Sequence, residues 1–86
     1  MKLDEIKDDI DSVMKVTTGD KTKNNMLEAI WNTVCLSEML NEQKYIEYTY
    51  KTILSSFKKT SVKELHNEEL SLLCNALIGA LLKQYI

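Results

Sequence analysis

The chain has 86 residues, of which 28% are charged, and its formal net charge is −2. A chain of this length usually forms one domain, so we expect residues 1–86 to fold as a single helical domain. All eleven basic residues are lysine. Because arginine is the side chain that reads guanine and phosphate with two parallel hydrogen bonds, its absence makes sequence-specific DNA binding less favourable.

The sequence offers no pattern for a cofactor, a metal or a catalytic centre. His66 is the only histidine, and Cys35 and Cys74 lie too far apart in the sequence for the paired spacing of a structural zinc site. A nucleophilic site that joined His66 to Cys74 would also need an orienting group and an oxyanion hole, and no pattern supplies them. We therefore predict a protein that is not an enzyme and that binds no cofactor and no metal.

Nothing in the sequence directs the chain to a membrane. The longest apolar stretch, residues 72–82, is shorter than the roughly 20 residues that cross a bilayer. The first residues are acidic and lack the apolar segment of a signal peptide. We therefore expect a cytoplasmic protein with both cysteines reduced.

Hydrophobic spacing predicts a first helix over residues 2–16. Apolar residues recur there at intervals of three and four, as the core-facing stripe of a helix requires. They are Leu3, Ile6, Ile10, Val13 and Met14. The acidic residues of this segment fall outside the stripe. The polar segment that follows, residues 17–24, contains Gly19 and is predicted to be a loop.

A second helix is predicted over residues 25–40, with Asn25 as its N-terminal cap and Glu28 three residues later. Asn41 is predicted to mark the turn into a third helix over residues 42–58. Because neither glycine nor proline stands at that turn, one continuous bent helix is the alternative.

The last part of the chain predicts a short helical turn and a fourth helix. Ser61 followed by Glu64 has the spacing of a capping box, so a helical turn is expected near residues 61–65. Asn67 is predicted to begin the fourth helix, over residues 67–85. Four helices with short connections predict an all-α fold, a compact antiparallel four-helix bundle.

The fourth predicted helix has more apolar surface than one core-facing stripe needs. The stripe consists of Leu70, Leu73, Cys74, Leu77, Ile78, Ala80, Leu81 and Tyr85. Three large aliphatic residues lie outside it, beside a ridge of small and polar residues that recur every fourth position. The aliphatic residues are Leu72, Leu82 and Ile86, and the ridge is Ser71, Asn75, Gly79 and Lys83.

The second predicted helix shows a similar surplus, because Leu36 and Leu40 stand away from its main apolar face. A regular four-helix bundle has no central helix, so two helices with two apolar faces predict association, with a second copy (a homodimer) or another protein. The predicted interface residues are Leu36, Leu40, Leu72, Asn75, Gly79, Leu82 and Ile86. The alternative is a central fourth helix that the other three cover on both sides.

The third predicted helix presents a face of lysine and tyrosine away from its core stripe. This face consists of Lys44, Tyr45, Tyr48, Lys51 and Lys58. Basic residues interleaved with aromatic ones suit an acidic protein surface or a nucleic-acid backbone. A solvated lysine face with tyrosines at the edge of the core is the alternative.

The first predicted helix carries an acidic face at Asp4, Asp8 and Asp11. A row of carboxylates can imitate the phosphates of a nucleic acid and occupy the groove of a partner that binds one. Most charged helix faces only keep a protein in solution, which is the alternative here.

These surfaces, together with the absence of catalytic patterns, predict a small protein-interaction module. We expect an inhibitor or regulator that docks on a larger protein and that self-associates. Small phage and plasmid proteins with counter-defence or immunity-like roles have the same profile of size, acidity and missing catalytic residues. The alternative function is a nucleic-acid-binding regulator that uses the lysine and tyrosine face of the third helix.

Overall fold

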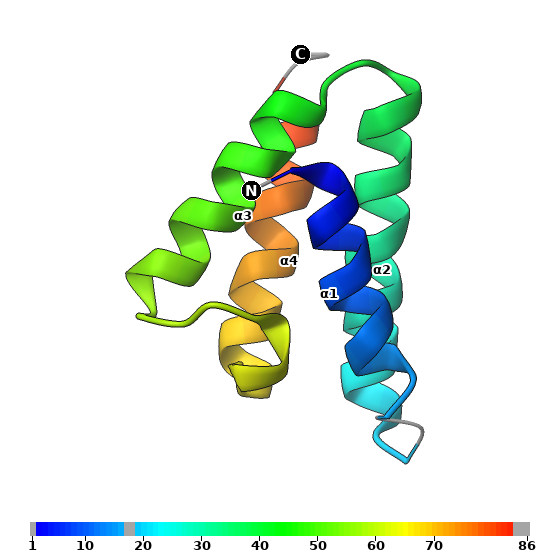
Figure 1. Cartoon of the computed structure of the whole chain (residues 1–86), viewed down its shortest axis with the longest axis vertical. Coiled ribbons are helices and arrows are strands. Elements are labelled where there is room, and N and C mark those ends of the chain that lie inside the picture. The colour runs from blue at the N-terminus through cyan, green and yellow to red at the C-terminus, as the bar shows by residue number, and fades with distance from the viewer. Residues whose placement is uncertain (1, 17–18, 84–86) are drawn as a thin grey trace.

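Regular structure is entirely helical in residues 2–16 and 19–83, which are the residues that the computed structural model describes (Figure 1). This part of the chain contains four α-helices and one short 3₁₀ helix. In order they are α1 (Leu3–Met14), α2 (Lys21–Met39), α3 (Gln43–Ser56), η1 (Val62–Glu64) and α4 (Asn67–Leu82). The predicted all-α four-helix bundle is confirmed, and so are the helical turn near residues 61–65 and the break at Asn41.

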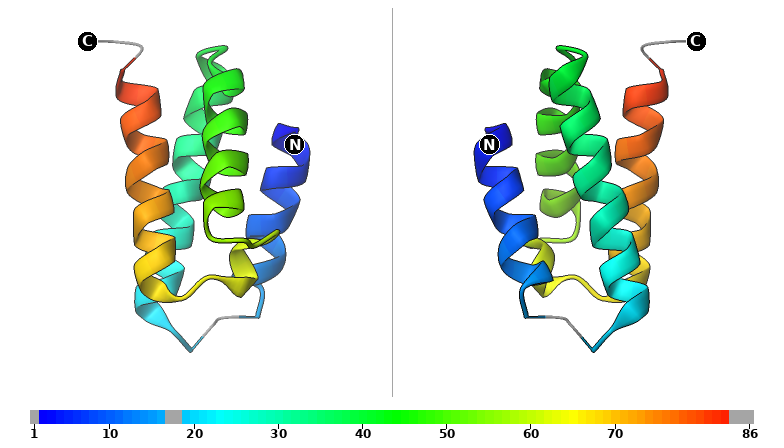
Figure 2. Two further views of the ribbon diagram at one scale, coloured as in Figure 1. Left: turned by 90° about the vertical axis from the view of Figure 1, so that its left-hand side faces the viewer. Right: turned by 90° about the vertical axis from the view of Figure 1, so that its right-hand side faces the viewer.

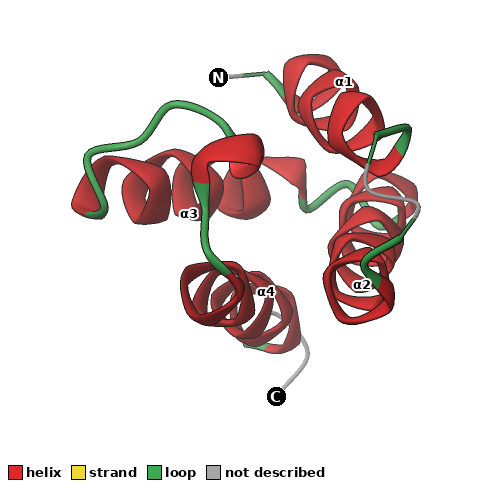
Figure 3. Cartoon of the chain, turned by 90° about the horizontal axis from the view of Figure 1, so that it is seen from below, coloured by secondary structure: helices red, strands yellow, loops and turns green. Residues whose placement is uncertain are grey.

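The helices are not equivalent in their surroundings. Successive helices run in opposite directions, whereas α2 and α4 run in the same direction and make the most extensive contact of any pair (Figure 1). Figure 2 shows α1 and α4 on the two outer sides of the molecule, with α2 and α3 between them. In the end view of Figure 3, α4 rests against α2 and α3 on one side. Its opposite side faces away from the other described helices.

All four helices contribute one stripe of residues to a single buried core. The buried apolar residues are Leu3, Ile6, Ile10, Val13, Leu27, Ile30, Val34, Ile46, Tyr50, Leu54, Val62, Leu65, Leu70, Leu73, Cys74, Leu77 and Leu81. In α1 and α4 these positions follow the predicted stripes closely, because helical periodicity of apolar residues determines which side of a helix faces inward. Ile78 is an exception: it was predicted for the core stripe, but its side chain is 37% exposed.

Two small hydroxyl residues of α2, Thr33 and Ser37, are also buried, although neither was predicted for the core. The Thr33 hydroxyl donates to the carbonyl of Ala29 (2.8 Å), and the Ser37 hydroxyl donates to the carbonyl of Val34 (2.7 Å). Because each hydroxyl is satisfied by the backbone of its own helix, its burial leaves no polar group without a partner.

The start of α2 corrects the sequence prediction. The helix begins at Lys21 and not at Asn25, so residues 21–24 are helical where a loop was predicted. The cap is Asp20, whose side chain accepts a hydrogen bond from the Lys23 N–H (3.0 Å). Aspartate has a strong preference for this position, and the extra turn places Thr22 beside α4.

α2 and α3 end in the same way, although neither ends at a glycine. Asn41 and Lys58, each directly after a C-terminal cap, have positive φ angles of 58° and 59°. In each case the next N–H donates back to a carbonyl of the last turn: Glu42 to Ser37 (2.8 Å) and Lys59 to Leu54 (2.9 Å). This is the Schellman arrangement, which terminates a helix by satisfying its free carbonyl groups.

Asp9 joins three elements of the fold. Its carboxylate accepts hydrogen bonds from the Tyr50 hydroxyl of α3 (2.6 Å), from the Ser61 hydroxyl, and from the Val62 N–H at the start of η1 (3.0 Å). The sequence placed this residue among the acids outside the core stripe of the first helix. The structure instead shows Asp9 half-buried, where it fixes α1 against α3 and the loop before α4.

Two further polar contacts hold α1 to its neighbours. The Leu3 N–H at the start of α1 donates to Glu47 Oε2 of α3 (2.8 Å). The Lys7 ammonium pairs with Glu38 Oε1 of α2 (2.6 Å), and the hydrogen bond to Glu38 raises the pKa of Lys7 above its usual value. α1 is therefore fixed by polar as well as apolar contacts on both sides.

Candidate interaction surfaces

The side of α4 that faces away from the bundle is a candidate interaction surface. We name the stripe Glu68, Leu72, Asn75, Gly79 and Lys83 the α4 outer face; its residues recur at intervals of three and four. Leu72 is 57% exposed, and the adjacent Leu82 is 52% exposed. Between Glu69 and Lys83 the sequence of α4 contains no charged residue. A helix side that meets only water normally carries charges, so this side has the composition of a contact surface.

Gly79 lies in this surface, and the fold does not require a glycine there. A side-chain Cβ at this position would meet nothing within 4 Å, and the glycine does not have a positive φ. Glycine inside a helix is less stable than alanine by about 0.5–1 kcal/mol. Within residues 2–16 and 19–83, neither backbone conformation nor packing explains the missing side chain.

α2 adds a second group of exposed apolar residues. Leu36 is 45% exposed and Leu40 is 41% exposed, and Met39, which sequence reasoning did not single out, is also exposed. Thr22 lines a cleft together with Leu72 of α4, which places the start of α2 beside the start of α4. The two helices run in the same direction (Figure 1), and Leu36 and Leu40 belong to the last turns of α2.

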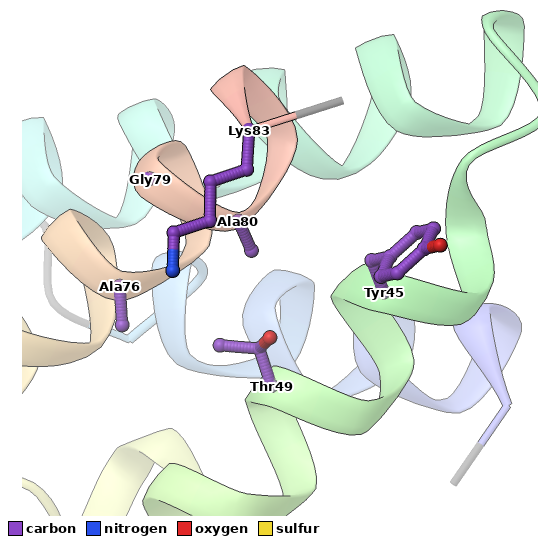
Figure 4. Close-up of a pocket in the computed structure, with 6 residues that line it drawn as sticks. All are labelled: Tyr45, Thr49, Ala76, Gly79, Ala80 and Lys83. Carbon is purple, nitrogen blue, oxygen red and sulfur yellow. The ribbon is translucent and has the colours of Figure 1, made fainter. Parts of the chain in front are cut away.

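A groove of about 500 Å³ runs between α3 and α4 (Figure 4). Its lining residues are Tyr45, Thr49, Ala76, Gly79, Ala80 and Lys83. Figure 4 shows Tyr45 and Thr49 on α3 facing the small residues of α4, and the Lys83 side chain extending back along α4 toward Ala76. Small side chains on α4 make this groove, so it is continuous with the α4 outer face at Gly79.

The predicted lysine and tyrosine face of the third helix is divided in the structure. Lys44, Tyr48 and Lys51 are exposed on α3. Tyr45 instead lines the groove toward α4. Lys58 does not lie on the helical arc predicted for it, because α3 ends at Ser56 and Lys58 belongs to the turn that follows. The face therefore comprises two lysines and one tyrosine.

The acidic face of α1 is also smaller than predicted. Asp4 and Asp8 are exposed, whereas Asp11 is half-buried and pairs with Lys15 (3.0 Å). That ion pair neutralises one of the three predicted carboxylates. Two exposed carboxylates remain on this side of α1, which is a short row for imitating a nucleic-acid backbone.

The two cysteines and the histidine have the following surroundings in the structure. Cys35 and Cys74 are both free thiols, Cys74 is buried, and burial raises the pKa of its thiol. The His66 N–H donates to Glu69 Oε1 (3.0 Å), so His66 occupies the capping position of α4, which begins at Asn67 as predicted. Among the described residues, no group of histidine, cysteine or acidic side chains is arranged to hold a metal ion.

No match emerged from comparisons with protein-family models, with curated proteins and with solved structures. Within the described part of the chain, no helix is long and apolar enough to cross a membrane.

The structure places four of the predicted interface residues together on α4. Leu72, Asn75 and Gly79 share the α4 outer face with Leu82 at its edge, and Leu36 and Leu40 are exposed on α2. Ile86 lies outside the described residues. Sequence reasoning missed Met39, whose spacing of three from Leu36 is the signal that could have identified it.

Proposed function

We propose that this chain is a small protein-interaction module that acts without catalysis, by docking on a larger protein. The observation that supports the proposal best is that the α4 outer face carries no charge between Glu68 and Lys83, while Leu72 on this face and Leu82 at its edge are more than half exposed. Leu36 and Leu40 are further exposed apolar residues, on α2. Burying a leucine side chain that is otherwise exposed contributes about 1.5–3 kcal/mol, so a partner gains substantially by covering several of them.

The biological role that fits this surface is inhibition or regulation in the cytoplasm. A helical surface without a catalytic group acts by occupying a site on its partner. The small size and acidic character of the chain support a phage- or plasmid-type counter-defence role or an immunity-like role. Self-association through the same helices is part of the proposal, because the apolar surface is available to a second copy of the chain as well.

The test is affinity capture with matched variants in cells of the native host. The tagged wild-type chain is expected to retain a specific protein, which is then purified and its binding measured directly by calorimetry. Leu36→Glu/Leu72→Glu should weaken binding by at least about 2 kcal/mol, because it places two charges in an apolar interface. Lys51→Glu serves as a control for the charge change on a different face. Equal binding by wild type and by the double variant would remove this surface from consideration.

The second candidate function is a nucleic-acid-binding regulator that uses α3. It is favoured by one observation: Lys44, Tyr48 and Lys51 are exposed together. Binding of this kind weakens steeply with salt, because lysines displace counterions from the phosphates. A mobility shift of generic duplex DNA that disappears on Lys44→Glu/Lys51→Glu would support it, and no shift at low salt would exclude it. The net charge of −2 makes it the weaker candidate.

A further inference from the structure

We propose that the α4 outer face binds the same face of a second copy of the chain, with the two α4 helices antiparallel. This proposal rests on the self-association that forms part of the proposed function, and it specifies the occupant, direction and register. The argument comes from how charge and side-chain size are distributed along the helix.

The charges of the α4 outer face are complementary to one another. Glu68 lies at its N-terminal end and Lys83 at its C-terminal end, both are exposed, and no charged residue lies between Glu69 and Lys83. Among the described residues neither Glu68 nor Lys83 forms an ion pair. In an antiparallel pair each Glu68 faces Lys83 of the second copy. A parallel pair would instead place Glu68 against Glu68 and Lys83 against Lys83, which is repulsive.

The same register matches the sizes of the side chains. The midpoint between Glu68 and Lys83 falls between Asn75 and Ala76, and so does the midpoint between Leu72 and Gly79. The register that pairs the charges therefore also places Leu72 of each copy against Gly79 of the other. The half-exposed leucine enters the open space around Gly79, where a Cβ would meet no atom of its own chain.

This arrangement explains why glycine is retained inside α4. Small residues at a helix crossing allow a short distance between the two helix axes, near the lower end of the usual range of about 8–10 Å. Gly79 also lines the groove between α3 and α4, so the incoming Leu72 contacts Gly79 and the small residues beside it. The stability that Gly79 costs the isolated helix is thereby recovered at the interface.

The test uses charge reversal and sedimentation equilibrium of the full chain. Glu68→Lys and Lys83→Glu should each raise the dimer Kd about tenfold, because each turns two attractive pairs into repulsive ones. The double variant Glu68→Lys/Lys83→Glu should return the Kd to within about threefold of wild type. Both reversals oppose the helix dipole, so recovery in the double variant does not come from a more stable helix. Glu28→Lys, with the same charge change at an exposed site on α2, should leave the Kd unchanged.

A further variant tests the packing of Leu72 against Gly79. It changes no charge, so its result does not depend on how well the charge-reversal variants fold. Gly79→Leu fills the space that Leu72 of the second copy would enter, and should raise the dimer Kd at least about tenfold. A Cβ at this position meets nothing within 4 Å in the single chain, and circular dichroism of the variant checks that the monomer stays folded. A chain that stays monomeric at every concentration overturns the proposal, and so does a dimer that the double reversal fails to restore. A dimer that is insensitive to these changes also overturns the proposal, because its interface lies elsewhere, whereas loss of host-protein capture by Leu36→Glu/Leu72→Glu still supports the proposed docking function.

Discussion

At the scale of single residues, Asp9 determines how α1 joins the rest of the fold. One carboxylate accepts three hydrogen bonds, from Tyr50, Ser61 and the Val62 backbone, which belong to two other segments of the chain. Hydrogen bonds to a charged acceptor are stronger than neutral ones, and a buried donor that loses its acceptor pays the full loss of hydration. The position of η1 against α1 therefore depends on this one side chain.

Asp9→Ala should lower the free energy of unfolding by about 1–3 kcal/mol, because it leaves the buried Tyr50 hydroxyl and its two companion donors without their acceptor. Urea unfolding followed by circular dichroism measures the change. Asp8→Ala, at the exposed neighbouring position, should stay within about 0.5 kcal/mol of wild type. Equal stability of the two variants would show that the network adds nothing to the fold.

Tyr50 makes stability depend on alkaline pH. Burial, together with the hydrogen bond to Asp9, raises the pKa of Tyr50 well above its ordinary value of 10.0. When the pH exceeds the ordinary pKa of 10.0, the unfolded chain releases the phenolic proton while the folded chain retains it. The free energy of unfolding therefore falls as the pH rises. The contribution is up to about 1.4 kcal/mol per pH unit.

Unfolding by urea at a series of alkaline pH values measures this dependence. Tyr50→Phe should remove its share of the slope, although its baseline stability is lower, whereas Tyr48→Phe, at an exposed position, should leave the slope as it is in wild type. A slope that is the same in all three proteins would contradict the assignment to Tyr50.

At the scale of elements, the helix ends show how local sequence and tertiary contacts share control. The end of α3 is set by Lys58, which adopts the left-handed conformation that glycine normally supplies. With Lys58 in this conformation, the Lys59 N–H donates to the Leu54 carbonyl (2.9 Å), and this hydrogen bond terminates the helix. The fold therefore tolerates a strained lysine at this turn.

Lys58→Gly should raise the free energy of unfolding by about 0.5–1 kcal/mol, because glycine adopts a positive φ without steric cost. The matched control is Lys51→Gly in the middle of α3, which should lower stability by about 1 kcal/mol. Thermal and urea unfolding of both variants give the signs. A loss of stability in both would indicate that Lys58 is not strained.

At the scale of the whole molecule, α4 combines two different environments along one helix. Leu72 is 57% exposed, whereas Leu73, the next residue, is fully buried against α2 and α3. The packing of α4 on only one side of the bundle produces this contrast (Figure 3). Neighbouring leucines therefore differ: Leu73 belongs to the core, whereas Leu72 remains exposed.

Leu73→Glu should unfold the protein or lower its stability by at least about 3 kcal/mol, because it buries a charge without a counter-ion. Leu72→Glu should leave the stability of the monomer within about 0.5 kcal/mol of wild type. Circular dichroism and urea unfolding at low protein concentration, where self-association does not contribute, measure both. If Leu72→Glu also unfolds the protein, both sides of α4 belong to the core, and the proposal that its outer face is an interaction surface is wrong.

Much of the fold followed from periodicity. The apolar residues at intervals of three and four predicted the four helices and most of their buried residues, because a helix repeats its direction at that interval. Helix ends were less certain: Asp20, and not Asn25, caps α2, whereas α4 begins at Asn67 as predicted. Several residues of each segment can occupy the cap, and tertiary packing decides which one does.

The sequence by itself determined that the protein is all-helical and that α4 has apolar residues beyond its core stripe. Which of these residues are exposed was decided by the tertiary structure alone, since α2 and α3 pack against one side of α4 and leave the other uncovered (Figure 3). Only the fold could bring Asp9 to Tyr50 and Val62 as well, because these residues are far apart in the chain. The physical reason is the same in both cases: periodicity records the direction of a side chain within its own helix, whereas its partners depend on how the helices are arranged.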